Sequence, residues 1–170
     1  MKKKIKITLI PVLFIGLLFC LPLFGGCQKD TLAEDTTTVS LSEIADDPSY
    51  ANLPLIGTKW KLVGFVDEKK GLIKLAEPLD DDIYTIIFHE SHRFSGKSST
   101  NVIEGEFEFD EKTATLEVKN IGGTKINEIL DGRRYMSLLE SSKRYEITEK
   151  GLLLFSNGTT YLLFSPSESS

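Results

Sequence analysis

The segment Ile103-Glu104-Gly105-Glu106-Phe107-Glu108-Phe109 alternates glutamates with apolar residues and a glycine. Successive side chains of a β-strand point to opposite faces of a sheet, so this period of two predicts a half-buried strand. Its glutamates would line a solvated face, while the isoleucine and phenylalanines would face a core. We therefore interpret the glutamates as surface residues and not as a catalytic or metal site.

Shorter alternating runs on both sides extend this pattern. Downstream, residues 114–118 continue the inward face in a hairpin whose turn we place at Glu111-Lys112. That turn would put Asp110 opposite Thr113 and Glu106 opposite Glu117. Upstream, two more strands are expected with shared inward faces: Trp60, Leu62, Gly64 and Val66 in residues 58–66, and Tyr84, Ile86 and Phe88 in residues 83–89.

The last third of the chain contains a clear hairpin signal. Asn157-Gly158 separates the apolar runs 152–156 and 159–165, and both turn residues tolerate positive φ. The two runs are apolar on both faces, so a second element must cover one of them. We expect that cover to be a short helix at residues 134–141; an obligate partner protein is the alternative.

Together these patterns predict a mainly β fold, a small antiparallel β-barrel or lipocalin-like domain with one short helix. It would occupy residues 55–166, followed by a tail at 167–170. The chain of 170 residues is 41% hydrophobic and 26% charged, which suits one globular domain with additional sequence.

Residues 1–26 have the layout of a lipoprotein signal peptide. Lysines precede an apolar run from Thr8 to Phe24, which is near the lower length limit for a membrane span, so an uncleaved anchor is the alternative. Leu23-Phe24-Gly25-Gly26 before Cys27 resembles a bacterial lipobox, in which the cysteine thiol accepts a diacylglycerol. We expect cleavage before Cys27 and its lipidation, and the loss of Cys20 leaves no thiol for a disulfide.

Residues 27–54 are predicted to hold the lipidated Cys27 and a flexible acidic tether. The stretch is rich in Thr and Ser and has no sustained period, so it cannot bury enough apolar surface to offset its ordering entropy. Gln28-Lys29-Asp30 resembles the export tag of surface-exposed Bacteroidetes-type lipoproteins. An ordinary hydrophilic spacer is the alternative.

The charge balance bears on the partners. Lys and Arg number 20 against 25 Asp and Glu, a formal net charge of -5, and four of the lysines lie within residues 1–6. An acidic body repels phosphate backbones and anionic headgroups, so we expect no nucleic-acid partner and no electrostatic membrane docking. The expected partners are the membrane, through the lipid anchor, and an envelope or host protein.

Residues that could carry chemistry do not assemble into a site. His89 and His92 are the only histidines, and a metal site would need further converging ligands. Asp80-Asp81-Asp82 lacks the alternating oxygen ligands and glycine of a calcium loop. We therefore expect no metal, no cofactor and no enzymatic activity, with a hydrolase using His89 or His92 as a remote alternative.

Several motifs resemble META/HslJ-type domains in order across about 110 residues. The opening strand is Gly57-Thr58-Lys59-Trp60-Lys61-Leu62-Val63, the central segment runs from Phe88 through Phe94-Ser95-Gly96 to Asn101, and the closing helix begins at Tyr135. Ser99-Thr100-Asn101 stands where the family has Gly-Cys-Asn, and the family's Thr-Arg-x-Ala-Cys is absent. The resemblance implies a small barrel with no known catalytic site, found in envelope proteins linked to stress or host interaction.

Two functions follow as the main hypotheses. The first is a non-catalytic, lipid-anchored interaction module at the outer membrane or the cell surface. The second is a binder of a small apolar ligand inside the barrel, with Trp60, Tyr84 and Phe88 as wall residues. A packed interior with an exposed apolar patch would favour the first, and an open cavity above roughly 300 Å³ the second.

Overall fold

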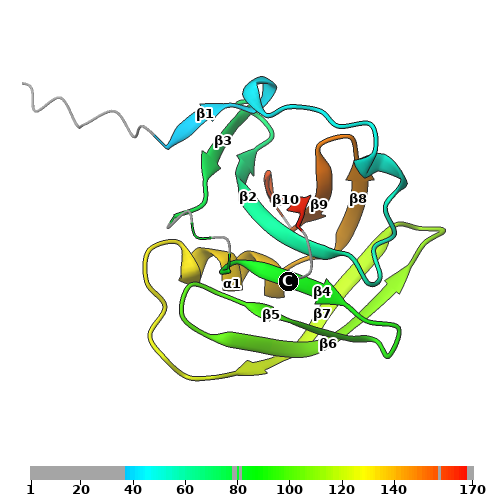
Figure 1. Ribbon diagram of the computed structural model, residues 1–170, viewed down its shortest axis with the longest axis vertical. Coiled ribbons are helices and arrows are strands. Elements are labelled where there is room, and N and C mark those ends of the chain that lie inside the picture. The colour runs from blue at the N-terminus through cyan, green and yellow to red at the C-terminus, as the bar shows by residue number, and fades with distance from the viewer. Residues whose placement is uncertain (1–36, 78–79, 81, 157, 168–170) are drawn as a thin grey trace, which may run out of the picture. The chain divides into compact units, whose positions relative to one another are not determined.

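The computed structural model describes residues 37–77, 80, 82–156 and 158–167, and Figure 1 labels its elements. The predicted signal peptide and the predicted lipidation site, Cys27, lie outside the described residues. The elements are, in chain order, β1 Thr38–Ser40, the 3-10 turns η1 Leu41–Glu43 and η2 Tyr50–Asn52, β2 Lys59–Asp67, β3 Leu72–Leu75, β4 Thr85–Phe88, β5 Arg93–Lys97, β6 Val102–Asp110, β7 Thr115–Gly123, α1 Gly132–Glu140, β8 Arg144–Thr148, β9 Gly151–Phe155 and β10 Thr160–Pro166.

The ten strands form one antiparallel sheet in the order β1-β3-β2-β10-β9-β8-β7-β6-β5-β4. β4 also pairs with β2, where Trp60 lies opposite Ile86. β7 and β8 pair only at Thr115 and Arg144 among the described residues. The predicted mainly β, antiparallel fold with one short helix is therefore confirmed. No helix in the described part of the chain is long and apolar enough to cross a membrane.

β6 has the predicted alternation, but the predicted register of its hairpin with β7 is wrong by two residues. Asp110 lies opposite Thr115, and Glu106 lies opposite Lys119. The turn occupies residues 111–114, and Ala114 has a φ of 54°. The shorter turn would have placed Lys119 opposite Glu104; the longer turn places it opposite Glu106, where it forms an ion pair with Glu108.

The predicted inward face of β2 is wrong at its last two positions, Gly64 and Val66: a Cβ on Gly64 would meet Ile73 of the second cluster. Trp60 and Leu62 are buried in the main core, but Val66 packs in a second cluster. The pairing of β2 with β10 shifts register beside Gly64, which marks a β-bulge. An extra residue reverses the alternation of side chains, so Phe65 takes the inward place expected for Val66.

Apolar side chains pack into two clusters on opposite faces of the β9–β10 hairpin. Leu154 and Leu162 belong to the main core, whereas Leu153 and Leu163 belong to the second cluster. The prediction that the helix covers the second cluster is wrong, because Tyr135 and Leu139, the buried apolar residues of α1, pack in the main core. The residues that cover the second cluster come from other segments: Val39, Leu41, Ile44 and Ile73.

The predicted boundary of the tether is also wrong, because residues from Thr37 onward pack on the second cluster and pair with the sheet. Val39 in β1 pairs with Ile73 in β3, and the Leu41 N–H donates to the Gly71 carbonyl at 2.9 Å. The Asp47 N–H donates to the Glu149 carbonyl at 2.8 Å. Residues 37–54 therefore belong to the folded body. The few apolar side chains of this segment follow no strand or helix period. They pack against the second apolar face of the β9–β10 hairpin.

Candidate functional site

The three residues predicted to wall a ligand cavity are packed in the main core. Trp60, Tyr84 and Phe88 each have 0% of their surface exposed. The Trp60 Nε1–H donates to the Leu55 carbonyl at 3.3 Å, and the ring of Phe88 lies edge-on to that of Phe107 with centroids 4.8 Å apart. None of the three lines the two surface hollows described below. These contacts give all three residues a packing role.

The buried phenols are hydrogen-bond donors at neutral pH. The Tyr84 hydroxyl donates to the Glu77 carbonyl at 2.6 Å. Burial raises the pKa of Tyr84 to about 12, with the carboxylates of Asp131 and Glu128 adding to the rise. Burial also raises the pKa of Tyr135, whose ring packs edge-on to Tyr84. Neither phenol is therefore suited to proton transfer near neutral pH.

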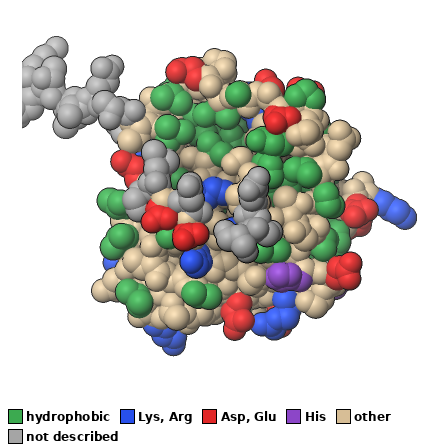
Figure 2. All heavy atoms as spheres, viewed as in Figure 1, with side chains coloured by type: hydrophobic (Ala, Val, Ile, Leu, Met, Phe, Trp, Pro, Cys, Tyr) green, Lys and Arg blue, Asp and Glu red, His purple; other side chains and the backbone are tan. Residues whose placement is uncertain are grey.

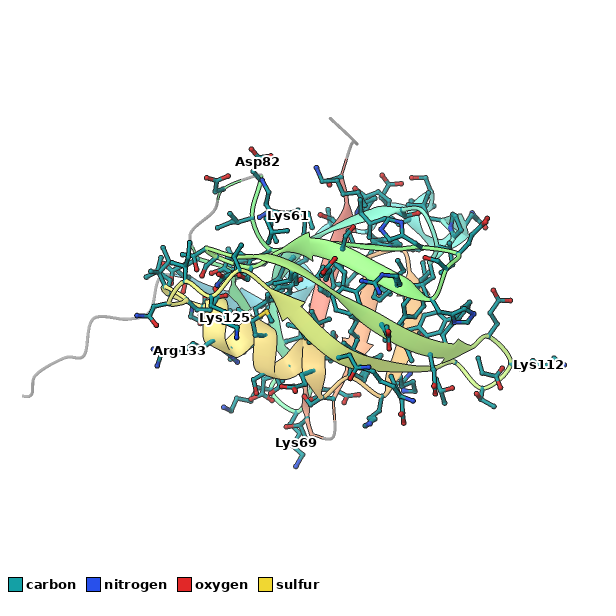
Figure 3. All side chains as sticks on the ribbon, turned by 90° about the horizontal axis from the view of Figure 1, so that it is seen from below. Lys61, Lys69, Asp82, Lys112, Lys125 and Arg133 are labelled. Carbon is teal, nitrogen blue, oxygen red and sulfur yellow. The ribbon has the colours of Figure 1, made fainter. Side chains whose placement is uncertain are left out.

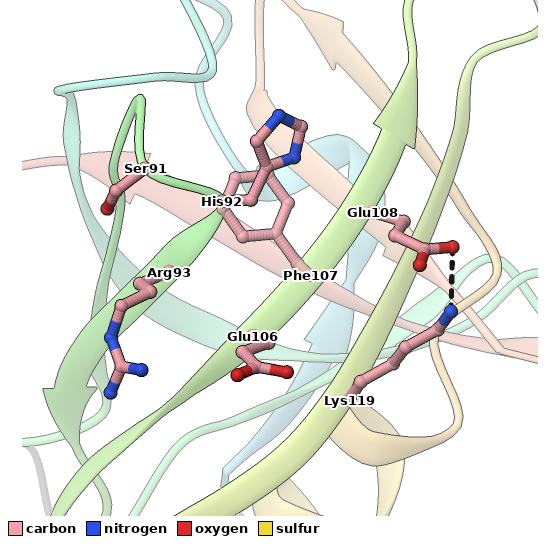
Figure 4. A pocket seen from close by; sticks show the side chains of 7 residues that line it. All are labelled: Ser91, His92, Arg93, Glu106, Phe107, Glu108 and Lys119. Carbon is pink, nitrogen blue, oxygen red and sulfur yellow. Dashed lines mark ion pairs between the residues drawn. The ribbon is translucent and has the colours of Figure 1, made fainter.

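A hollow of about 430 Å³ opens on the outer surface of the sheet, where the β4–β5 turn meets β6 and β7. Figure 4 shows His92 above the ring of Phe107, with charged side chains around them. We call this feature the charged hollow. Its lining residues are Ser91, His92, Arg93, Glu106, Phe107, Glu108 and Lys119.

Charges of both signs line the charged hollow, and Phe107 behind them is 1% exposed and belongs to the main core. Lys119 Nζ lies 2.6 Å from Glu108 Oε2, and this hydrogen bond holds the pKa of Glu108 below its usual range. Glu106 accepts a hydrogen bond from the Asn120 amide at 2.8 Å. His92, at a φ of 57°, places its ring 5.9 Å from that of Phe107. Such a surface suits a polar partner that presents both positive and negative side chains.

The histidines form an incomplete catalytic arrangement. His89 Nε2 lies 2.8 Å from Ser95 Oγ, a contact that a nucleophilic serine would need. Among the described residues, no carboxylate hydrogen-bonds to His89, and no group of three or more His, Cys, Asp or Glu side chains could hold a metal. Figure 2 shows a histidine at the surface among charged side chains.

Asp80, from the acidic run considered as a calcium loop, has a role within its own turn: its carboxylate accepts a hydrogen bond from the Asp82 N–H at 2.9 Å.

A buried polar network that the sequence did not predict lies between the end of β5 and the loop before α1. Glu128 accepts hydrogen bonds from the Ser98 hydroxyl and the Asn101 amide, both at 2.6 Å, and also from the Ser99 hydroxyl. Ser98, Ser99 and Asn101 are at most 7% exposed. The Ser-Thr-Asn run was visible in the sequence, but its partner 27 residues beyond Asn101 was not.

The network determines the charge state of Glu128. Burial alone would raise the pKa of this carboxyl group, but the hydrogen bonds from Ser98, Ser99 and Asn101 outweigh it and hold the pKa below its usual value. Glu128 is therefore ionised at neutral pH and accepts all of these bonds. The arrangement fixes the backbone of the loop above it.

That loop, residues 124–131, exposes large apolar side chains. Ile126 is 62% exposed, Ile129 50% and Leu130 68%, and Val102 at the start of β6 is 56% exposed. We call residues 124–131 the apolar loop. Its exposed side chains were also missed from the sequence, because the segment has no strand or helix period.

Comparisons with known proteins identify the fold alone. No family model and no curated protein matches this chain. A crystal structure of a DUF4847 family protein from Bacteroides vulgatus is similar, with 20% identity, coverage of 68% of this chain and 96% of that chain, and a TM-score of 0.50. An NMR structure of a protein from Burkholderia xenovorans is similar at 19% identity, covering 73% and 90%, with a TM-score of 0.54.

Proposed function

We propose that this chain is a non-catalytic, lipid-anchored envelope protein that acts as an interaction module at the outer membrane or the cell surface. The observation that carries the proposal is the charged hollow, which is open to solvent and has a volume of about 430 Å³. The residues expected to wall an interior cavity, Trp60, Tyr84 and Phe88, are instead packed in the core. Cys27 is the lipidated residue in this proposal. The partner is an envelope or host protein that presents charges of both signs.

The alternative, a binder of a small apolar ligand inside the sheet, has less support. Trp60, Tyr84 and Phe88 would have to line its cavity, and all three are fully buried against neighbouring side chains. A hydrolase also has less support, because the His89–Ser95 contact has no described carboxylate to orient the imidazole.

The fold of the module is best described, in our proposal, as a small lipocalin-like barrel of the META/HslJ type. The additional pairing of β4 with β2 brings two distant strands of the sheet order together, as closure of a barrel requires. The single residue pair between β7 and β8 is the weakest point of that ring. The cysteines that this family carries in its central loop and in the segment before the helix have no equivalent here.

The anchor is tested by metabolic labelling with a fatty-acid analogue, followed by membrane fractionation. We expect label on the wild-type protein and none on Cys27→Ser, because the thiol is the acceptor. Equal labelling of both proteins would contradict lipidation at Cys27. Protease treatment of intact cells separates the two locations, since only a surface-exposed body would be cleaved.

The interaction surface is tested by pull-down from envelope extracts with the full-length, lipidated protein. Arg93→Glu reverses one charge at the hollow, where the Arg93 side chain is 51% exposed. Lys112→Glu makes the same change in the β6–β7 turn, outside the hollow. We expect Arg93→Glu to lose the captured partner and Lys112→Glu to retain it; equal capture by both would exclude the hollow as the binding surface.

A further inference from the structure

The apolar loop lies beside the point where the described chain begins. Thr38 pairs with Lys74 across the β1–β3 ladder, and Lys74 Nζ lies 2.7 Å from Asp131 Oδ2 at the end of the loop. Thr38 and Arg134 also line one shallow hollow. In Figure 1 the start of β1 and the loop before α1 lie on the same side of the described body. The segment leading to Cys27 therefore enters next to the apolar loop.

The chain between Cys27 and this entry point is short. Residues 37–54 belong to the folded body, so ten residue steps separate Cys27 from Thr37. A fully extended chain spans at most about 3.6 Å per residue, which limits this separation to about 36 Å. A lipid anchor at Cys27 would hold the entry side of the body near the membrane surface.

In and next to the apolar loop the acidic side chains are bonded to the body, whereas two basic side chains are exposed, as a lipid interface requires. The two acids are turned inward, because Glu128 is bonded to the serines and Asn101, and Asp131 pairs with Lys74. Lys125 and Arg133 are exposed, and neither forms an ion pair with another described residue. Cations flanking exposed aliphatic side chains are typical of segments that lie in the headgroup region.

The exposed side chains are held out by a rigid support. The Asn101 side chain binds both backbone groups of Ile126: its Oδ1 accepts from the N–H, and its Nδ2 donates to the carbonyl, each at 2.8 Å. The Ile129 N–H donates to Ser99 Oγ at 3.1 Å. The backbone is thus fixed from below while the aliphatic side chains face solvent, so little ordering entropy would be lost on binding.

We propose that the apolar loop inserts Ile126, Ile129 and Leu130 into the interface of the membrane that holds the anchor. This inference rests on the proposed lipidation of Cys27. The contact is apolar, and it agrees with an acidic body that would not dock by electrostatic attraction. Lipid insertion also gives the body a fixed orientation relative to the membrane.

That orientation leaves the charged hollow accessible. Within β6, Val102 lies beside the apolar loop, where its N–H donates to the Thr124 hydroxyl at 3.2 Å, and Glu108 lies in the charged hollow. Six residues of extended strand separate these positions by about 20 Å. Figure 3 shows Lys125 and Arg133 on one side of the body and Lys112 on the opposite side. The loop and the hollow would therefore serve the membrane and the partner separately.

The test uses tryptophan as a depth probe in the full mature protein, reconstituted into phosphatidylcholine vesicles with and without brominated acyl chains. Ile126→Trp and Ile129→Trp place the probe on the apolar loop at exposed positions. Lys112→Trp is the matched control on the opposite side. Trp60 is the only native tryptophan and is 0% exposed, so the wild type supplies the baseline. Flotation and mass spectrometry verify vesicle attachment and acylation.

We expect both loop probes to shift to shorter emission wavelength and to lose severalfold more emission to brominated lipid than Lys112→Trp does. Loop probes quenched no more than the control, on protein that is acylated and floats with the vesicles, would overturn the insertion and leave the anchor intact. This is also the outcome expected if the loop binds a protein instead. Protein that lacks acyl chains would overturn the proposed anchor, and the inference with it.

Discussion

Replacing Val39, Leu41 and Ile44 together by serine should destabilise the body substantially. All three side chains are half-buried against the second cluster, where they cover Val66 and Leu163, which are 0% and 1% exposed. Full burial of a Val, Leu or Ile side chain stabilises by about 1.5–3 kcal/mol, so the partial burial of these three contributes at least about 1 kcal/mol each. We therefore expect the triple variant to lose at least about 3 kcal/mol of unfolding free energy.

A matched control is available in the same molecule. Ile126, Ile129 and Leu130 are also three aliphatic residues, but at least half of each is exposed. Their triple replacement by serine should change the unfolding free energy by less than about 1 kcal/mol, because exposed positions contribute little.

Both variants are measured in the chain from residue 28 onward, which lacks the predicted signal peptide and Cys27. Urea unfolding is followed by far-UV circular dichroism and by the fluorescence of Trp60. A first variant as stable as the second would refute the conclusion that residues 37–54 belong to the folded body, and would restore the flexible tether predicted from the sequence.

Three further predictions concern the core and the polar network. Leu139→Ala should cost about 2–5 kcal/mol in urea unfolding, because Leu139 is 0% exposed in the main core, whereas Ser137→Ala on the exposed side of α1 should cost less than about 0.5 kcal/mol. Gly96→Ala should cost about 1–3 kcal/mol in the same assay, because its Cβ would overlap the Thr85 carbonyl oxygen, and Gly122→Ala, which meets open space, should not. The pKa of Glu128 is lowered from 4.5 in the folded state, so its network is fully stabilising above about pH 4.5 and is lost as pH falls through the folded value. Amide exchange at Ile126 and Ile129, corrected for intrinsic rates, should therefore accelerate at acid pH, and Glu128→Gln should abolish that acid-dependent step.

The local pattern predicted individual elements well where one face is buried and the other is wet. The alternation in β6 and the inward faces of β4 followed from a period of two, and α1 followed from the spacing of Tyr135, Leu138 and Leu139. Predictions failed where one or two additional residues change the geometry. The bulge beside Gly64 and the longer β6–β7 turn each moved later side chains to new neighbours.

The candidate site was less predictable than the fold. Glu128 is joined to Ser98 across 30 positions in the sequence, and the charged hollow combines residues from the β4–β5 turn with β6 and β7. Neither set has a spacing rule, because such contacts depend on how strands lie in the sheet. The wall candidates were correctly placed on inward faces, but inward residues of a packed sheet contribute to the core.

The sequence by itself determined the β-rich class and the helix position, since these depend on neighbours two to four residues apart, and its composition determined the acidic character of the chain. Only the tertiary structure decided what residues 37–54 do. Val39, Leu41 and Ile44 are too few to fold alone, and they are ordered because the β9–β10 hairpin has a second apolar face to cover. The same long-range packing brought the chain entry beside Ile129 and Leu130, which is the basis of the proposed membrane contact.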